Sequence, residues 1–372
     1  MRILHAVLSE GFYGSERYCV ELATAQARAG HQVEVLIADG TSDCAKIFRR
    51  EISATNAAIG SAGPGRIALT VIPRWVPTWL HRPFAARALG RFKPELVHTH
   101  LNPAGRRIGR VAQDRGIPHV ATLHLDYEAR EHAGCDGLIA IASWQCAHIG
   151  PEFRGEAAVI WNWLPAGMSE ALARAPPAER ADLRRRWRAD DASVVIGSIG
   201  RLMPAKGMDV LVRAFRLAFP HGDERVRLVI LGDGPLRGEL ARCAGGDDRI
   251  VLLGPQPEVA ALYRGFDVYV SAARFEPFGL TILEAMAAGL PLILTRTDGP
   301  REFVTDARVT WIAPDDEASL AGALAAARER SPQRMSYDLA PFSPQRALTE
   351  IDAFYRAVLA RTGQRSRNSD AR

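Results

Sequence analysis

The 372-residue chain has 47% hydrophobic and 24% charged residues and a formal net charge of +5. This length accommodates two domains with full cores, and so mild a charge gives no sign of a nucleic-acid partner. No apolar run approaches the roughly 18–20 residues that a membrane span needs. The N-terminal apolar stretch is too short for a signal peptide and predicts a first strand instead. Five scattered cysteines without metal or redox spacing suit core positions in a reducing cytoplasm.

Residues 1–163 alternate predicted strands and helices and are expected to form one domain. Strands are predicted at 3–7, 31–38, 68–72, 95–99, 119–123, 137–142 and 157–161, and helices at 16–29, 104–115 and 143–148. Such alternation indicates a parallel, doubly wound sheet, in which ligands bind beyond the carboxyl ends of the strands. Ser15 is expected to cap the first helix. Gly14, which permits close backbone approach, and His124, at the end of a strand, both belong to that edge.

A segment rich in proline and alanine, residues 164–180, has no strand pattern and is interpreted as an interdomain linker. Residues 181–342 then repeat the alternation and predict a second doubly wound domain, with strands at 194–198, 227–231, 250–253, 267–270, 292–295 and 310–312. A final helix over 343–361 carries an apolar stripe, which has to pack against something. Its return to the first domain is one expectation, and the polar tail 362–372 is predicted to be disordered.

The most informative stretch runs from Arg274 to Gly289, with the sequence RFEPFGLTILEAMAAG. It predicts a loop carrying Glu276, a helix entrance at Gly279 and a helix over 280–288. The first backbone N–H groups of a helix lack intrahelical partners and, with the helix dipole, form an anion site. Here these groups belong to Phe278, Gly279, Leu280 and Thr281.

Carboxylates flank this anion site, Glu276 before the helix and Glu284 in its second turn. A nucleotide diphosphate sugar fits the combination, with phosphate on the amides, ribose on one glutamate and sugar hydroxyls on the other. The alternative is an ordinary amphipathic helix that is closed by Gly289 and Pro291.

Two cations, Arg201 and Lys206, fall in one loop after a predicted strand of the second domain. Together with the helix amides they would stabilise the negative charge that develops on a departing diphosphate, without a metal. Their alternative interpretation is a pair of solvated surface charges. No paired carboxylates at a strand end suggest a divalent-cation site, so neither a metal nor another cofactor is expected.

With these motifs, the chain resembles the retaining glycosyltransferases of family 4, which have the α/β architecture of two Rossmann-like domains called GT-B. The resemblance covers nearly the whole chain and rests on four motifs: FYGSER (12–17), GRLMPAKG (200–207), LGDGP (231–235) and the E-x7-E stretch at 274–289. It implies two domains that face each other across a cleft.

The resemblance also implies roles for individual residues. Four are implied to be catalytic: His124 near the sugar and reaction centre, Arg201 and Lys206 on the diphosphate, and Glu276 on sugar hydroxyls. The other implied donor contacts are the backbone of Gly14 near the diphosphate, Glu284 on the ribose, Pro255 near the base, and Phe278 to Thr281 on phosphate.

One departure from the family pattern is Tyr13, which stands where the first loop often carries a second glycine. Tyr13, Glu16 and His124 are the candidates for binding the acceptor. By resemblance the anomeric configuration is retained. No second carboxylate is placed as a nucleophile, which favours attack from the front face.

Residues 74–93 are basic, aromatic and free of acidic side chains. They would suit an anionic membrane surface, with Trp75, Trp79 and Phe84 in the interface. The alternative is an ordinary helix with its apolar side in the core. A membrane-bound enzyme of this kind would act on a lipid-linked glycan, such as a lipopolysaccharide core, from a cytoplasmic position peripheral to the inner face of the plasma membrane.

Three rival functions are distinguished by their chemistry. The fold and its phosphate site also serve phosphorylases and sugar-nucleotide epimerases. A non-catalytic partner subunit would keep the fold but not the turnover. A nicotinamide-dependent dehydrogenase is disfavoured, because no strand–GxGxxG–helix unit with a following acidic residue occurs.

Overall fold

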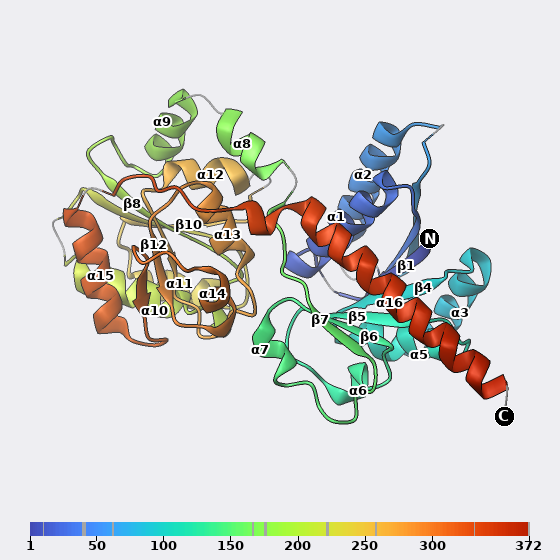
Figure 1. The fold of residues 1–372 in the computed structure, drawn as a ribbon. Coiled ribbons are helices and arrows are strands. Elements are labelled where there is room, and N and C mark those ends of the chain that lie inside the picture. Colours follow the sequence, from blue (N-terminus) through green and yellow to red (C-terminus); the bar gives the residue numbers. More distant parts are fainter. Residues whose placement is uncertain are drawn as a thin grey trace. The chain divides into compact units, whose positions relative to one another are not determined.

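The computed structural model describes residues 1–9, 11–38, 42–61, 63–165, 167–174, 177–220, 223–256, 259–330 and 332–370. The chain divides into two compact units. Met1–Trp163 and Phe342–Arg372 form the first unit, and Leu164–Pro341 form the second. In each unit a sheet of parallel strands carries helices on both faces (Figure 1).

The sheet of the first unit has the strand order β3-β2-β1-β4-β5-β6-β7, and all neighbouring strands pair in parallel. The strands are β1 (Arg2–Val7), β2 (Gln32–Ala38), β3 (Arg66–Ile72), β4 (Leu96–His100), β5 (His119–Leu123), β6 (Gly137–Ala140) and β7 (Glu156–Val159). The order reverses between β1 and β4, so the binding edge of a doubly wound sheet lies at their carboxyl ends.

Helices cover both faces of this sheet. One face packs against α3 (His81–Phe92) and the segment of α4 (Asn102–Ala104), a π-helical turn (Gly105–Gly109) and α5 (Arg110–Gln113). The opposite face packs against α1 (Gly14–Arg28), α2 (Ser42–Ile59) and α16 (Pro344–Asp370). The short helices α6 (Ala129–His132) and α7 (Ser143–Cys146) lie after β5 and β6.

The C-terminal helix therefore belongs to the first unit, as one of the sequence-based expectations has it. Its residues Ala347, Ile351, Tyr355 and Val358 are buried with Ile3 in one core cluster. This stripe has the helical spacing expected of an amphipathic helix. The helix continues to Asp370, whereas the sequence predicted a disordered tail from residue 362. The polar composition of the tail suggested disorder, but the tail continues α16 as further helical turns.

The sheet of the second unit has the order β10-β9-β8-β11-β12-β13, again with parallel neighbours. The strands are β8 (Val194–Ile199), β9 (Val226–Leu231), β10 (Ile250–Gly254), β11 (Val268–Ser271), β12 (Leu292–Thr295) and β13 (Thr310–Ile312). The order reverses between β8 and β11. These two strands therefore point their carboxyl ends at the binding edge of this unit.

The core on one face of this sheet is closed by α10 (Met208–Ala218), α11 (Arg237–Ala244) and α15 (Glu317–Glu329). On the other face lie α12 (Val259–Gly265) and α13 (Leu280–Ala287) (Figure 1). The short α14 (Asp298–Phe303) follows β12.

The segment interpreted as a linker contains two helices, α8 (Met168–Arg174) and α9 (Pro177–Arg186). Both contact α12 and belong to the second unit. Arg180 of α9 donates to Asp267 Oδ1 at 2.6 Å, and the buried Arg184 donates to Asp267 Oδ2 at 2.8 Å. The segment that its proline and alanine content predicted to be a linker therefore contains helices, and ion pairs with Asp267 hold one of them, α9, to the second unit.

Candidate active site

The binding edge of the second unit is formed by the loops after β8 and β11. The first loop carries Arg201 and Lys206, and the second carries Arg274 and Glu276. The backbone N–H groups of Arg274 and Phe275 both donate to the carbonyl of Ala205, at 2.8 and 3.1 Å. These bonds dock one loop on the other, so two motifs about 70 residues apart in sequence become a single surface.

Gly207 makes this docking possible. Its φ of +60° is left-handed, and a Cβ at this position would lie 1.9 Å from the carbonyl oxygen of Ala272. Only glycine combines that φ with so close a backbone approach. The glycine that ends the cationic motif is therefore required by contact with the end of β11.

Lys206 and Glu276 form an ion pair at this docked surface, with Nζ and Oε2 2.6 Å apart. The Lys206 side chain is 25% exposed and that of Glu276 11% exposed. The pair joins the residue predicted to contact the diphosphate with the residue predicted to contact the sugar. Both side chains are therefore partly exposed.

Arg274 holds the two loops together and was not assigned a role from the sequence. Its guanidinium donates to both carboxylate oxygens of Asp209 at 2.9 and 2.8 Å, to Asp315 Oδ1 at 2.7 Å and to the Pro204 carbonyl at 2.6 Å. These hydrogen bonds lower the pKa of Asp209 and raise that of Arg274. Arg274 stands three residues beyond the end of the buried strand β11, and a charged residue so close to a strand end was the available signal in the sequence.

Helix α13 begins at Leu280, with Gly279 as its N-cap at a φ of +108°. The helix entrance therefore lies directly after the Glu276 loop, as the anion-site prediction requires. Phe278 is buried and stacks on Phe303, with ring centroids 4.7 Å apart. Leu280 and Thr281 are partly exposed.

Glu284 lies in α13 and is only 5% exposed. Its Oε2 accepts a hydrogen bond from the hydroxyl of Tyr263 at 2.7 Å. A second tyrosine, Tyr269, donates to Thr281 Oγ1 at 2.8 Å. The two tyrosines orient the first turns of α13, and no local sequence pattern pointed to either.

Arg201 and Pro255 are exposed residues at the same edge of the sheet. Arg201 follows β8, and the loop around it is held by the turn after β9, because the Leu202 N–H donates to the Asp233 carbonyl at 2.9 Å. Pro255 follows the last residue of β10, Gly254, which has a φ of +74°. Both positions agree with their expected place at strand carboxyl ends.

In the first unit, α1 begins at Gly14 with Tyr13 as its N-cap, and Ser15 is not the cap. Glu16 is buried, and its Oε2 accepts from the Tyr13 N–H at 2.8 Å and from the Ser15 hydroxyl at 3.1 Å. The Glu16 carboxylate thus closes the first turn of α1. Tyr13 and Gly14 are exposed, so of the acceptor candidates in this loop Tyr13 is the accessible one.

His124 follows β5 and is partly exposed. The Tyr18 ring of α1 packs edge-on against its imidazole, with centroids 4.9 Å apart. Since Tyr18 lies one turn beyond Gly14, α1 brings the glycine loop to the same strand edge as His124. On the other side, His124 Nε2 lies 3.2 Å from His100 Nδ1.

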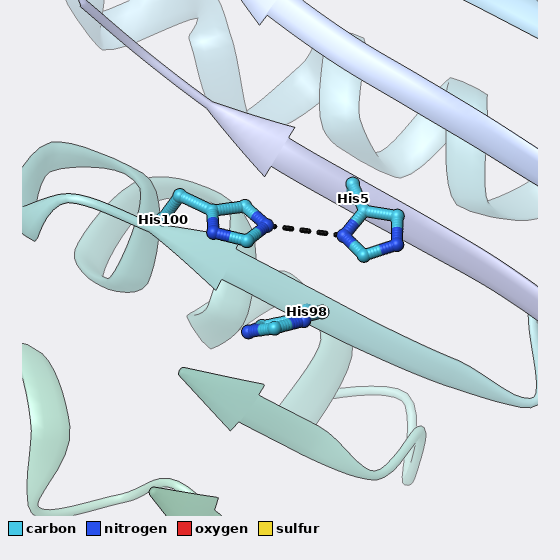
Figure 2. A group of neighbouring side chains, drawn as sticks. All are labelled: His5, His98 and His100. Atoms are coloured by element: carbon cyan, nitrogen blue, oxygen red, sulfur yellow. Dashed lines mark hydrogen bonds between the residues drawn. The ribbon is translucent and has the colours of Figure 1, made fainter. Parts of the chain in front are cut away.

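His100 belongs to a buried cluster with His5 and His98, which the sequence did not single out. His5 comes from β1 and the other two from β4, where alternate residues face the same side of the sheet (Figure 2). Nitrogen atoms of the three rings lie within 4.8 Å of one another, which is a metal-like grouping. The repeat of histidine at positions 98 and 100 within a buried strand was the available signal.

Hydrogen bonds engage every ring nitrogen of this cluster. His5 contacts Gln26 and His100, at 2.7 and 3.0 Å. His98 contacts the Tyr355 hydroxyl and Thr122 Oγ1, at 2.5 and 2.7 Å. With the contact from His100 to His124, all six nitrogens have partners, and an ion would have to displace some of them. The six ring nitrogens therefore fit a hydrogen-bond network, in which each proton has a fixed position, better than they fit a metal site.

The basic aromatic segment contains a 3-10 turn (Thr78–Leu80) and α3. Trp75 and Trp79 are 76% and 74% exposed. Phe84, expected beside them, packs against the core instead. The helix α3 buries its inner face in the core, whereas the residues before it leave the two tryptophans exposed, and binding to a membrane stays a prediction. Within the described part of the chain, no helix combines the length and apolar character that spanning a bilayer requires.

The two-sheet architecture matches solved structures along its whole length. HepE of Anabaena, solved with UDP and glucose, aligns with a TM-score of 0.71 and 18% identity over 100% of this chain and 99% of that one. WaaG, a glycosyltransferase involved in lipopolysaccharide biosynthesis, aligns with a TM-score of 0.67 and 17% identity over 96% and 98%. The fold is that of the GT-B glycosyltransferases.

Sequence relationships then identify the family. The profile of Glycosyltransferase Family 4 matches residues 12–166, and that of Glycosyl transferases group 1 matches residues 193–329. A GDP-mannose-dependent alpha-mannosyltransferase of Mycobacterium tuberculosis is 30% identical over 67% of each chain. The lipopolysaccharide core biosynthesis glycosyltransferase LpsD of Rhizobium meliloti is 27% identical over 97% of this chain and 100% of its own. The chain belongs to the family 4 glycosyltransferases, as the motifs predicted.

Proposed function

We propose that the protein transfers a sugar, with retention and without a metal, from a nucleotide diphosphate sugar to a hydroxyl of a glycan or lipid-linked glycan. The observation that carries this proposal is the Lys206–Glu276 pair, which the docked loops hold beside the entrance of α13. A cation, a carboxylate and a helix N-terminus at one strand edge suit a ligand with both phosphates and hydroxyls.

Donor binding would rearrange this pair. The diphosphate competes with Glu276 for Lys206, and Arg201 on the same loop adds a second positive charge. Once Lys206 turns to phosphate, the Glu276 carboxylate is available to accept hydrogen bonds from sugar hydroxyls. Glu284, held by Tyr263, is assigned to the ribose, and the backbone near Pro255 to the base.

The transfer itself requires positioned charge and no protein nucleophile. The acceptor oxygen forms a bond to the anomeric carbon on the face from which the diphosphate leaves, and the sugar–phosphate bond breaks. The acceptor proton passes to the departing phosphate oxygen. Arg201, Lys206 and the α13 amides stabilise the negative charge on that leaving group. His124 in the first unit is assigned to the sugar and the reacting hydroxyl, with Gly14 near the diphosphate.

A thermal-shift panel of UDP-, GDP- and ADP-sugars without divalent metal tests the donor site. A ligand that binds only the folded state raises the melting temperature, so one nucleotide class should give a shift. Arg201→Ala should abolish that shift. Arg242→Ala, which removes an exposed arginine from α11, is the matched control and should retain it.

Turnover then separates the rival functions. Glu276→Ala should lose transfer to a glycan acceptor while the folded protein survives. Sugar release that depends on inorganic phosphate would indicate a phosphorylase, and interconversion of the nucleotide sugar alone an epimerase. Binding without any turnover, unchanged in Glu276→Ala, would indicate a non-catalytic subunit. Any of these results would contradict the proposed transfer.

We also infer that the acceptor is anchored at an anionic membrane surface, as in lipopolysaccharide or other cell-surface polysaccharide assembly. Two neighbouring tryptophans that are three-quarters exposed are costly in water and suit a membrane interface. Arg74 and Arg87 lie on the same segment and are exposed. The relationships to LpsD and WaaG support a lipid-linked acceptor.

Liposome sedimentation tests this surface. The protein should bind vesicles that contain phosphatidylglycerol more strongly than vesicles of phosphatidylcholine alone, and high salt should weaken the binding. The double variant Trp75→Ser, Trp79→Ser should lose most of the binding. Leu217→Ser changes an exposed apolar residue of the second unit and should bind like the wild type. Equal binding by both variants, or none at low salt, would overturn this inference.

A further inference from the structure

A chain of hydrogen bonds runs through the buried side of the first sheet and ends at His124. It begins at Gln26 of α1, whose Oε1 lies 2.7 Å from His5 Nε2. His5 Nδ1 lies 3.0 Å from His100 Nε2, and His100 Nδ1 lies 3.2 Å from His124 Nε2. Gln26, His5 and His100 are fully buried, whereas His124 is partly exposed. The chain thus connects the core with the one histidine assigned to the substrate.

The amide of Gln26 gives this chain a direction. Its Nε2 faces the hydroxyl of Tyr355 on α16 at 3.5 Å, and its Oε1 faces His5. The Tyr355 hydroxyl in turn lies 2.5 Å from His98 Nδ1. In this arrangement the amide N–H donates to Tyr355, the tyrosine donates to His98, and Gln26 Oε1 can only accept.

The proton positions follow from that acceptor, one ring at a time. His5 must carry its proton on Nε2, because that atom donates to Gln26. Its bare Nδ1 then accepts from His100 Nε2–H. His100 Nδ1 is consequently bare and accepts from His124 Nε2–H. A neutral imidazole has one donor and one acceptor nitrogen, so the protonation of one ring determines which nitrogen of the next ring carries the proton.

We propose that Gln26, His5 and His100 act as positioning residues that hold His124 as the neutral Nε2–H tautomer. The lone pair on His124 Nδ1 is then available to accept a hydrogen bond from a substrate hydroxyl. This assignment of Nδ1 to a substrate rests on the proposed sugar transfer, whereas the tautomer itself rests only on the hydrogen-bond chain.

The hydrogen-bond chain also excludes one role for His124. The chain ends at the neutral amide of Gln26, which cannot bind a proton, so it cannot take up the proton that the acceptor hydroxyl loses. Burial supports the neutral state, since it lowers the pKa of His5 to about 4, and the partial burial of His124 also lowers the pKa of that ring. His124 therefore orients a hydroxyl, and the proton leaves with the phosphate oxygen.

Nitrogen-15 NMR of protein labelled at histidine reads the tautomer directly. Long-range proton–nitrogen correlations at pH 7.5 distinguish a protonated from a bare nitrogen in each ring. The His124 signals among the ten histidines are those missing from His124→Gln. The expected result is a protonated Nε2 and a bare Nδ1. A protonated Nδ1 at His124 would mean that the chain runs in the opposite direction, and would overturn the proposal.

Variants test whether distant members impose that tautomer. Gln26→Met keeps the side-chain shape and removes the acceptor, which lies three hydrogen bonds away from His124, so the His124 tautomers should become mixed. His100→Asn keeps an acceptor near the position of the imidazole Nδ1 and should preserve the Nε2–H form. His100→Leu removes that acceptor and should lose it. A pure Nε2–H signal in both Gln26→Met and His100→Leu would show that the hydrogen-bond chain does not determine the His124 tautomer, and would overturn the proposal.

Activity provides a second readout that separates this proposal from the proposed function. In Gln26→Met, kcat should fall about tenfold, the rate factor of one net hydrogen bond. The thermal shift with the donor, which the second unit is proposed to bind, should stay unchanged. His100→Asn should restore most of the rate that His100→Leu loses. Failure of the wild type to transfer sugar would contradict the proposed function alone, and the NMR result would still decide the relay.

The same cluster is also the described grouping most like a metal site, which gives a further possible refutation. Purified protein is expected to contain less than stoichiometric zinc, iron or copper, with the same NMR pattern before and after chelation. A stoichiometric metal that is lost in His5→Gln would mean that the three histidines bind a metal and do not form the hydrogen-bond chain, which would overturn the proposal. Gln26 lies outside the three-histidine cluster, so Gln26→Met should not change metal content in either case.

Discussion

At the scale of single residues, the candidate donor site depends on side chains that the motif does not name. Lys206 and Glu276 are motif positions, yet their 2.6 Å contact exists because Arg274 holds the loops that carry them. Tyr263 has the same relation to Glu284. The residues proposed to touch the donor are therefore preorganised by partners from other segments of the chain.

Arg274→Lys tests this dependence. A lysine keeps the charge but lacks the planar fork that binds both oxygens of Asp209. We expect the free energy of unfolding to fall by about 2 kcal/mol and kcat/KM to fall by about tenfold or more, because Lys206 and Glu276 lose their register. Denaturant unfolding and steady-state kinetics measure the two effects.

A matched control exists in the same unit. Arg308 also makes a forked contact, to Asp306 at 2.9 and 2.6 Å, but its side chain is 60% exposed and it joins no loops of the site. Arg308→Lys should change stability much less than Arg274→Lys does and leave the kinetics unchanged. Equal kinetic effects in the two variants would contradict a positioning role for Arg274.

At the scale of elements, the site is a consequence of how two parallel strands end. β8 and β11 are neighbours at the point where the strand order reverses, so the loops that follow them diverge and leave the binding edge open. The first sheet repeats this arrangement at β1 and β4, which lead to the glycine loop and to His100. Close backbone packing then determines how these loops sit.

Gly207→Ala should disrupt that packing more than its backbone angle alone explains. Gly245, which ends α11, has nearly the same φ of +63°, but the nearest atom to a Cβ at that position would be an arginine nitrogen at 3.4 Å. Gly245→Ala should therefore cost only about 1 kcal/mol, the strain of a left-handed residue. Gly207→Ala adds the clash with Ala272 and should cost about 3 kcal/mol.

Thermal or denaturant unfolding compares the two variants. Gly207→Ala should also lose the donor-induced thermal shift, because the cationic loop can no longer dock on β11. Equal destabilisation of the two proteins, with donor binding intact in both, would show that the approach of Gly207 to Ala272 does not shape the site.

At the scale of the whole molecule, the chain is two units with unequal chemistry in their cores. The second unit has a largely apolar core under α10 and α15. The first unit is closed by α16, which returns from the end of the chain, and its sheet buries a set of histidines. Buried neutral histidines make the stability of a protein depend on pH.

The free energy of unfolding should therefore decrease as the pH falls from 7 towards 4. Burial lowers the pKa of His5 to about 4 and that of His119 to about 3, against about 6.5 in an unfolded chain. Between these values the unfolded chain binds more protons than the folded one, so acid favours unfolding. Each such histidine contributes on the order of 2 kcal/mol of lost stability at pH 5.

Denaturant unfolding at pH 7 and pH 5 measures the effect, and His5→Gln should reduce the difference by one histidine's share. The carboxylate Asp306, whose pKa is lowered to about 2 by Arg308, contributes only at still lower pH, so the two effects separate. Stability that is unchanged between pH 7 and pH 5 would contradict the burial of neutral histidines.

Much of the fold was predictable because its signals are local. Each strand is a short apolar run between turn residues, and all thirteen described strands lie within a few residues of their predicted positions. The failures have local causes as well. The proline- and alanine-rich segment resembles a linker until Arg180 and Arg184 find Asp267, more than eighty residues away.

The sequence by itself determined the two-domain α/β class, the family, the loops that carry Arg201, Lys206 and Glu276, and the helix that carries Glu284. These were predictable because spacing within one motif is preserved in the folded chain. Only the tertiary structure decided which side chains hold these residues. Arg274 and Asp209 are 65 positions apart, and His5 and His100 are 95 apart. Such pairs meet because parallel strands far apart in sequence lie side by side, and that adjacency is a property of the folded sheet.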